Sequence, residues 1–339
     1  MSASSTRRWK RYPRQSRSST RQAAPEGTRF FREQVGVPTA GSLVRNVAEE
    51  IDVDNESRIA FVGPGVMAEA MIAGLIRQAI VPEESIVVSG PRAARIEELG
   101  ERYGIRWMTD NAAAAEDADV VVLAVKPQRL DQVMNDLRGR VRSSALVLSI
   151  VAGTTIKKIA LGLNHGSVVR SMPNTPAQIG EGITVWTAAE VVSDQQKETA
   201  REILTAFGDE VFVDEERFLD MATALSGTGP AYVFLFMEAM VDAGVHLGFS
   251  RRIAEILVAK TIRGSVDFYS RPDDPLHLAR LRNQVTSPGG TSAAALYYLE
   301  KAGFRTALSR AIWAAYERSR ELGVDSSAHW PESLAGASD

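Results

Sequence analysis

The chain has 339 residues, of which 45% are hydrophobic and 24% are charged, a composition ordinary for a soluble globular protein with room for two domains. It contains no cysteine, which excludes disulfides, thiolate nucleophiles and thiolate metal sites; we identify no other metal-ligand set and expect a cytoplasmic protein. The net charge of −3 combines a basic start with an acidic remainder.

The first segment of the chain is basic and rich in serine. Residues 1–32 contain nine Lys and Arg residues and one acid, Glu26. Such a segment can be a targeting peptide or a nucleic-acid-binding arm, but its composition favours a disordered extension, to which we assign residues 1–56. We expect no nucleic-acid partner. We also expect no membrane contact, because no apolar run approaches the ~20 residues of a membrane helix.

Strand and helix patterns alternate from residue 57 onward. Residues 58–62 form a short apolar strand, and after two glycines the apolar residues of 66–80 recur at helical spacing. Further strands are expected at 85–88, 119–125, 145–151, 168–172, 183–186 and 210–213, and further helices at 92–103 and 130–137. Apolar strands that alternate with helices predict a doubly wound parallel sheet, hence an N-terminal Rossmann-type α/β domain over residues 57–214.

The chain after residue 215 is expected to be entirely helical. Helices are predicted at 218–225, 231–247, 250–269, 292–301 and 304–321, with Ser250 and Ser292 as N-caps. The stretch 232–237 is apolar on every face, so neighbouring helices must bury it. We therefore assign residues 215–325 to an all-α dimerisation and substrate domain of an obligate homodimer or larger homo-oligomer, and residues 326–339 to a C-terminal tail.

The turn after the first strand has the pattern of a dinucleotide site. Gly63 allows a tight turn, Gly65 lets the backbone approach a pyrophosphate, and Ala68 lets helix and strand pack closely. Val66 and Met67, at the start of the following helix, offer free N–H groups to the phosphates. A merely tight turn is the alternative interpretation.

The end of the second strand indicates which dinucleotide binds. An acidic residue there would mark NAD, but this strand is followed by Ser89 and Arg92, which suit a 2'-phosphate. We predict NADPH, with NADH as a weaker alternative, although Arg92 can also be an ordinary helix arginine. The other residues that we assign to the cofactor are Asn111, Val125, Lys126, Pro127, Ala152, Asn174 and Gln284.

A cluster of hydroxyls and glycines precedes the helix predicted at 292–301. The segment 283–292 reads Asn-Gln-Val-Thr-Ser-Pro-Gly-Gly-Thr-Ser. A Gly-Gly turn before a helix directs unpaired N–H groups at one spot, and hydroxyls supply neutral donors, so the segment suits a small carboxylate. A capped helix without a ligand is the alternative interpretation.

Four separated segments resemble the pyrroline-5-carboxylate reductase family. They are Leu123-Ala-Val-Lys-Pro127, Arg170-Ser-Met-Pro-Asn-Thr-Pro176, Leu225-Ser-Gly-Thr-Gly-Pro-Ala-Tyr232 and the segment 281–300 that contains the Ser-Pro-Gly-Gly loop. They occur in the order and spacing of that family. The resemblance extends from about residue 57 to about residue 321.

The resemblance implies an enzyme that reduces the C=N bond of 1-pyrroline-5-carboxylate with NADPH, which is the last step of proline biosynthesis. It also implies a helical domain that interlocks with a partner subunit, and an active site between the two domains at the dimer interface. The substrate site would comprise Ser287, Gly289, Gly290, Thr291 and Ser292, with the N–H groups of residues 289–291 on the carboxylate. The catalytic hydroxyl of Ser292 would face the imine nitrogen.

This sequence departs from the family pattern at three positions. Ser292 stands where most members have Thr, so the hydroxyl is kept but the methyl group that restricts its rotamer is lost. Leu278 follows His277 where Pro is usual, and Gln284 stands where some members have Asn near the cofactor. Asn174 and Thr175 are expected to shape the nicotinamide pocket; a rigid linker between strands is the alternative.

Two other classes of function compete with this interpretation. β-Hydroxyacid dehydrogenases and imine reductases share the domain order, but they usually carry a catalytic Lys or Asp on the long interdomain helix. Here the helix after Pro230 has Glu238 and Asp242 and no lysine, and the Ser-Pro-Gly-Gly loop would stay unexplained. A nucleotide sensor or nucleic-acid-binding protein that uses the basic arm is the second alternative.

Overall fold

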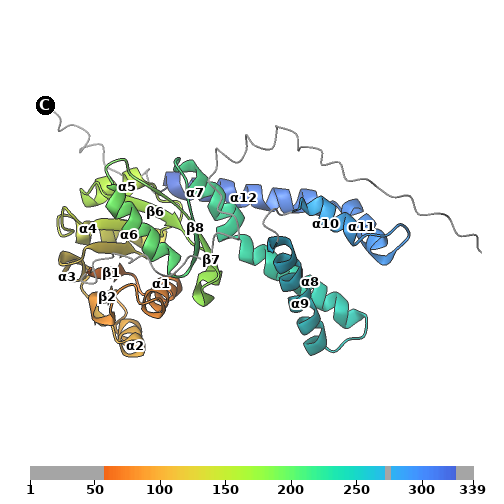
Figure 1. Ribbon diagram of the computed structural model, residues 1–339. Helices are drawn as coiled ribbons and strands as arrows, with labels where there is room; N and C mark the ends of the chain where they lie inside the picture. The colour runs from red at the N-terminus through yellow and green to blue at the C-terminus, as the bar shows by residue number, and fades with distance from the viewer. Residues whose placement is uncertain (1–56, 272–275, 326–339) are drawn as a thin grey trace, which may run out of the picture.

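The computed structural model describes residues 57–271 and 276–325, so the assignments for residues 1–56 and 326–339 lie outside the described residues. An eight-stranded sheet occupies one half of the molecule, in the order β3-β2-β1-β4-β5-β6-β7-β8 (Figure 1). The strands are β1 Ile59–Val62, β2 Ile86–Ser89, β3 Arg106–Met108, β4 Val120–Leu123, β5 Leu146–Ser149, β6 Val168–Met172, β7 Gly182–Ala188 and β8 Gly208–Phe212.

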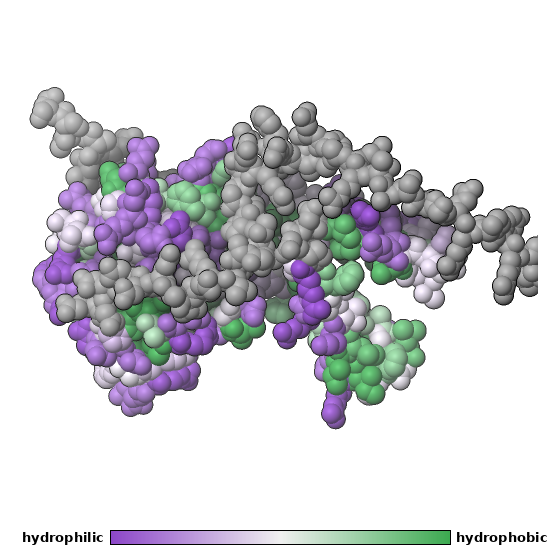
Figure 2. Space-filling model, in the orientation of Figure 1, coloured by the Kyte–Doolittle hydropathy of each residue, from purple (hydrophilic) through white to green (hydrophobic). Residues whose placement is uncertain are grey.

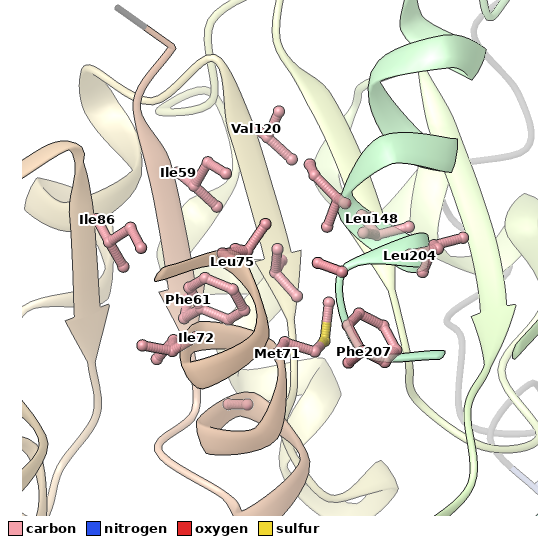
Figure 3. Packing of buried hydrophobic residues seen from close by; sticks show 14 of the residues in the cluster. Ile59, Phe61, Met71, Ile72, Leu75, Ile86, Val120, Leu148, Leu204 and Phe207 are labelled. Atoms are coloured by element: carbon pink, nitrogen blue, oxygen red, sulfur yellow. The ribbon is translucent and has the colours of Figure 1, made fainter. Parts of the chain in front are cut away.

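Helices cover both faces of this sheet, because its strands alternate apolar side chains to opposite sides. On one face Ile59 and Phe61 pack under α1 Val66–Arg77, α2 Ala93–Tyr103 and α6 Asp194–Thr205 (Figure 3). On the other face Ala60 and Val62 pack under α3 Asn111–Glu116, α4 Pro127–Leu137 and α5 Ile156–Leu163. The expected Rossmann-type fold is confirmed.

The sheet is not parallel throughout, which corrects the prediction. Strands β1 to β6 are parallel, whereas β7 is antiparallel to β6 and β8 is parallel to β7. Only residues 173–181 connect β6 to β7, and they hold the short 3-10 helix η3 Thr175–Ile179. A parallel crossover needs a dozen or more residues, so this link can only reverse the chain. A second short 3-10 helix, η2, spans Glu83–Ser85.

Helices alone follow the sheet among the described residues. They are α7 Arg217–Ala222, the π-helix η4 Thr223–Gly227, α8 Gly229–His246, α9 Arg251–Ser270, α10 Leu278–Gln284, α11 Thr291–Lys301 and α12 Phe304–Asp325. Helices α8 and α9 form a hairpin that projects away from the sheet, while α12 runs from α11 back to the sheet domain (Figure 1).

The two N-caps expected from the sequence have different outcomes. Ser250 is the N-cap of α9, although its side chain makes no capping hydrogen bond. Ser292 is not a cap: the cap of α11 is Gly290, and Ser292 is the second helical residue, which corrects the prediction. The glycine can take the cap position because that position needs only an extended backbone, here with φ −83° and ψ 170°.

The helical half exposes much of its apolar surface. On α8, Phe234 and Leu235 are 63% and 67% exposed, and Leu247 at its end is 83% exposed. Hydrophobic residues gather on the α8–α9 hairpin in Figure 2. By length and composition alone, the helical run Arg217–His246 could also cross a membrane, which differs from our expectation that no run is long and apolar enough. A contiguous apolar surface of this kind marks a contact with another protein or with lipid.

Candidate dinucleotide and substrate site

The turn after β1 needs glycine at its first position. Gly63 has φ +110°, and its N–H donates to the Ser89 carbonyl at 2.9 Å. A Cβ atom at Gly63 would lie 2.7 Å from the Ala124 carbonyl oxygen and 2.8 Å from Val125 Cγ1. The backbone after β1 therefore lies directly against the backbone after β4, the neighbouring strand at which the order of the sheet reverses.

Gly65 is constrained differently. It has φ −79° and ψ 170°, which any residue adopts, and a Cβ atom would meet only the Ala124 oxygen at an ordinary 3.6 Å. Nothing within the described protein requires glycine here, so the space above Gly65 is available to a ligand. Gly65 is also the N-cap of α1 without a side-chain cap, and the first N–H groups of α1 are open to an anion. Val66, on this turn, is 58% exposed, Met67 is half-buried and Ala68 is buried under the helix.

A charged cluster supports the glycine turn and was not found from the sequence. Arg95 Nε donates to the Pro64 carbonyl oxygen at 3.4 Å, and the guanidinium pairs with Glu69 and with Glu98. Burial raises the pKa of Glu69, but the hydrogen bonds from Arg95 and Tyr103 outweigh it, so the pKa of that carboxyl lies below its usual value. Glu69 and Arg95 are 26 residues apart, so no local spacing indicates that pair.

The end of β2 presents one cation to solvent. Arg92 is the exposed N-cap of α2, and its guanidinium has no hydrogen-bond or ion-pair partner among residues 57–271 and 276–325. Ser89 is fully buried, and its hydroxyl donates to Asn111 Oδ1 at 2.9 Å. A direct contact of Ser89 with a 2'-phosphate is therefore not supported by this geometry. Its hydroxyl instead orients Asn111, which begins α3.

The ends of β4 and β5 lie on the same edge of the sheet. Lys126 is the exposed N-cap of α4, with half-buried Val125 and Pro127 on either side. Ala152 is half-buried and follows β5. Carboxyl ends of parallel strands share one edge, so these residues, Asn111 and the glycine turn surround one region.

Asn174 follows β6 and serves as a structural link. Its Nδ2 donates to the Ser226 carbonyl oxygen at 3.3 Å, and its Oδ1 accepts from the Ile183 N–H at 3.0 Å. The side chain therefore joins the sheet to η4. A cofactor would therefore have to contact other atoms of Asn174, or share Nδ2 and Oδ1 with Ser226 and Ile183.

The Ser-Pro-Gly-Gly loop forms a tight turn before α11. Gly289 has φ +73°, and the Gly290 N–H donates to the Ser287 carbonyl oxygen at 3.0 Å. The Ala294 N–H donates to the Gly290 carbonyl oxygen at 3.2 Å. The N–H groups of Gly289 and of residues 291–293 have no partner among the described residues. Of the three N–H groups assigned to a carboxylate, the structure thus uses that of Gly290 inside the loop.

The loop and the glycine turn lie in different parts of one chain. Helices α10 and α11, which flank the loop and include Gln284 and Ser292, are at the end of the molecule remote from β1 (Figure 1). Gln284 is exposed and Ser292 half-buried. One chain therefore gathers the strand-end residues at one edge but does not bring the loop or Gln284 to them.

The fold and the glycine turn define an oxidoreductase domain of the dinucleotide-binding class joined to a helical domain. Two family models match: residues 58–153 match one described as NADP oxidoreductase, coenzyme F420-dependent, and residues 216–322 match pyrroline-5-carboxylate reductase dimerisation. The second match covers α7 to α11 and most of α12. It assigns the exposed apolar helices, including the run Arg217–His246, to a dimerisation domain.

Relatives and solved structures agree with both matches. The chain is 42% identical over 266 residues to pyrroline-5-carboxylate reductase of Synechocystis, covering 78% of this chain and 98% of the relative. It is 34% identical over 283 residues to pyrroline-5-carboxylate reductase 1 of Bacillus subtilis, covering 83% and 94%. The Plasmodium falciparum pyrroline carboxylate reductase structure with NADP bound superimposes with a TM-score of 0.73 at 34% identity, covering 79% and 99%. The chain belongs to the pyrroline-5-carboxylate reductase family, as the sequence motifs predicted.

Proposed function

We propose that this protein is an NADPH-dependent pyrroline-5-carboxylate reductase that reduces 1-pyrroline-5-carboxylate to L-proline, the last step of proline biosynthesis, in the cytoplasm. The proposal depends on two separate parts of a site. One is the open glycine turn on the sheet domain, and the other is the Gly-Gly loop with unpaired N–H groups on the helical domain; we call them half-sites. Relatives that share 34–42% identity across nearly their whole length bear the same name.

The residues of the sheet domain fit a phosphorylated dinucleotide. The space above Gly65 and the open N–H groups of α1 suit a pyrophosphate, and the exposed guanidinium of Arg92 suits a 2'-phosphate. NADPH is therefore preferred over NADH, which lacks the group that Arg92 would neutralise. When bound, NADPH supplies the hydride that reduces the imine carbon.

The loop of the helical domain fits the substrate carboxylate. The N–H groups of Gly289, Thr291 and Ser292 are available, and Gly290 shapes the turn through its bond to Ser287. The positive end of the dipole of α11 favours an anion at this point. Ser292 lies on the first turn of the helix, so its hydroxyl can bond the ring nitrogen while the carboxylate is held beside it.

This site works by positioning and not by strong acid catalysis. A cyclic imine with a pKa near neutrality can bind already protonated, so the nitrogen needs an orienting hydrogen-bond acceptor more than a general acid. The Ser292 hydroxyl can accept from that N–H. Binding that holds the ring at reactive distance lowers the activation barrier, and good alignment lowers it by several kcal/mol.

The two half-sites meet only when two chains associate. The exposed apolar faces of α8 and α9, and a groove of about 520 Å³ whose lining includes Leu296, Phe304, Leu308 and Trp313, provide the surface for a partner. We propose a homodimer, or a larger assembly of dimers, in which the loop of each subunit completes the cofactor site of the other. This arrangement explains why the loop lies far from the glycine turn of its own chain.

The test is NADPH oxidation at 340 nm by purified protein given 1-pyrroline-5-carboxylate. The six-membered piperideine analogue and a 3-oxoacid serve as controls. Fast turnover of the five-membered imine is expected. No turnover of any imine by protein that still binds NADPH would refute the proposal, and turnover of the 3-oxoacid would favour a hydroxyacid dehydrogenase.

A further inference from the structure

A buried polar cluster joins the sheet domain to the helical domain. At its centre is Arg170 on β6, which is 3% exposed. Its Nη1 donates to Glu216 Oε1 and its Nη2 to Asp220 Oδ1, each at 3.0 Å. Ser319 on α12 donates to the same Asp220 oxygen at 2.9 Å. One guanidinium therefore bonds directly to the segment that begins the helical domain and, through Asp220, to its last helix.

A second contact beside the cluster reinforces the link. A Cβ atom at Gly153 would lie 2.8 Å from Leu322 Cβ, and one at Gly323 would lie 2.6 Å from the Gly153 carbonyl oxygen. The backbone of α12 thus touches the loop that follows β5, next to Ala152. Ser319 is the one buried residue of α12 among those whose exposure is described. Most of α12 is exposed, so its attachment to the sheet domain is confined to its last turns.

The hydrogen bonds of the cluster hold the two domains in one relative orientation. We call this cluster of Arg170, Glu216, Asp220 and Ser319 the clamp. An apolar contact tolerates sliding, whereas a planar guanidinium bonded to two carboxylates fixes direction as well as distance. Glu216 also accepts the Ile156 N–H at 2.8 Å, so it caps the first turn of α5. Without the clamp, only the chain connection near residue 214, the Asn174–Ser226 hydrogen bond and the contact of Gly153 with α12 would resist rotation of one domain against the other.

The position of α12 determines where the substrate loop lies. This helix has 22 residues, about 33 Å at 1.5 Å per residue, and it extends from the sheet domain to α11 (Figure 1). Helix α11 begins at the Gly-Gly turn. A small rotation at the clamp therefore displaces the sheet domain relative to the helical domain and to the partner's helical domain that is joined to it.

We propose that Arg170 is a positioning residue of the reaction, which clamps α7 and α12 to the sheet and so sets how the cofactor site of its own sheet domain meets the loop 287–292 of the partner subunit. The proposal rests on the proposed function. The helical domains of the two subunits are held to each other, so a damaged clamp lets the sheet domain of its own chain shift against the partner's loop. NADPH binding within that sheet domain stays intact, and the partner's active site, whose own clamp holds, is unaffected.

The first test compares Arg170→Met and Arg170→Lys with Arg142→Met. Arg142 forms an Arg–carboxylate pair with Asp119 at 3.0 Å, but this pair lies within the sheet domain. Arg170→Met is expected to lower kcat/KM for the imine roughly ten- to a hundredfold with NADPH affinity unchanged, because misplacement by about 1 Å can cost that much. The Lys variant should fall between, and the Arg142 control should match the unmodified enzyme. Equal loss of NADPH affinity, or unchanged turnover, overturns the proposal.

The decisive test is complementation between subunits. Ser292→Ala removes the loop hydroxyl but keeps the clamp, and Arg170→Met does the reverse. Neither homodimer should turn over at the normal rate, but random mixing after subunit exchange should restore about a quarter of the unmodified activity, since half of the dimers gain one intact site. No recovery by mixed dimers means that Arg170 acts through the loop of its own chain, which contradicts a role in positioning its own sheet domain.

Two further measurements cover failure of folding and of the proposed function. If Arg170→Met does not fold, Ser319→Ala, which leaves the guanidinium paired, should show the same selective loss, smaller in size. The chain has no cysteine, so Glu101→Cys and Lys301→Cys can carry spin labels in dimers diluted with unlabelled chain. The distance between the labels should broaden in Arg170→Met, or in Ser319→Ala where that variant replaces it, and stay narrow in Arg142→Met. Absence of turnover by the unmodified enzyme would refute the proposed function. The distance between the labels would then still show whether Arg170 holds the two domains in one orientation.

Discussion

Substitution by Ala should have different effects at the two glycines of the turn after β1: it should lower the stability of the fold at Gly63 and the affinity for NADPH at Gly65. Gly63→Ala forces an L-residue to φ +110° and places its Cβ 2.7 Å from a backbone oxygen. Positive φ costs about 1–2 kcal/mol and overpacking a further 1–3 kcal/mol, so the free energy of unfolding should fall by about 2–5 kcal/mol. For a domain of this size, that corresponds to a Tm lower by roughly 5–20 °C.

Gly65→Ala should leave the fold intact and remove the ligand. Its backbone is already extended, and the new Cβ meets the Ala124 oxygen at 3.6 Å, so Tm should stay within a few degrees of the unmodified value. The Cβ occupies the space proposed for the pyrophosphate, so the Kd for NADPH should rise at least tenfold, or about 1.4 kcal/mol. Differential scanning calorimetry and isothermal titration measure the two effects. An unchanged Tm in Gly63→Ala, or unchanged affinity in Gly65→Ala, would refute the reasoning.

Three other substitutions test the cofactor, the substrate and the assembly. Arg92→Ala should raise the Kd for NADPH by roughly ten- to a hundredfold while that for NADH is unchanged, because only the 2'-phosphate contact is lost; equal effects on both would count against it. Ser292→Ala should lower kcat/KM for the imine by roughly ten- to a hundredfold and Ser292→Thr should preserve it, whereas a fully active Ala variant excludes the hydroxyl. Leu235→Glu should give monomers at micromolar concentration in light scattering, while Leu161→Glu on the sheet domain, exposed to 56%, should not; a persistent Leu235→Glu dimer would show that α8 is not in the interface.

The sequence predicted the elements that contain long apolar segments. The strands that were predicted between residues 58 and 172 and the helices at 231–247 and 250–269 lie where their hydrophobic patterns indicated. Helix α6 was missed because it begins Asp-Gln-Gln-Lys-Glu and buries few side chains, among them Ala200, Ile203 and Leu204. The edge strand β3, which reads Arg-Trp-Met, was missed for a similar reason, since an exposed edge does not require an apolar run.

Within the site, the sequence located strand ends better than side-chain directions. Ser89 is the last residue of β2 and Asn174 follows β6, but packing turns the Ser89 hydroxyl to Asn111 and the Asn174 amide to Ser226 and Ile183. Which way a short polar side chain points depends on the nearest partner in space. Spacing along the chain carries no information about that partner.

The sequence by itself determined the family, the glycine turn and the helical character of the second half, because each follows from a local pattern of residue types. Only the tertiary structure decided the direction of β7, the support of Pro64 by Arg95, and the clamp around Arg170. The partners of Arg170 are 46 and 50 residues away, and Ser319 is 99 residues from Asp220. Contacts over such separations form only when the whole chain has packed, so no spacing in the sequence can indicate them.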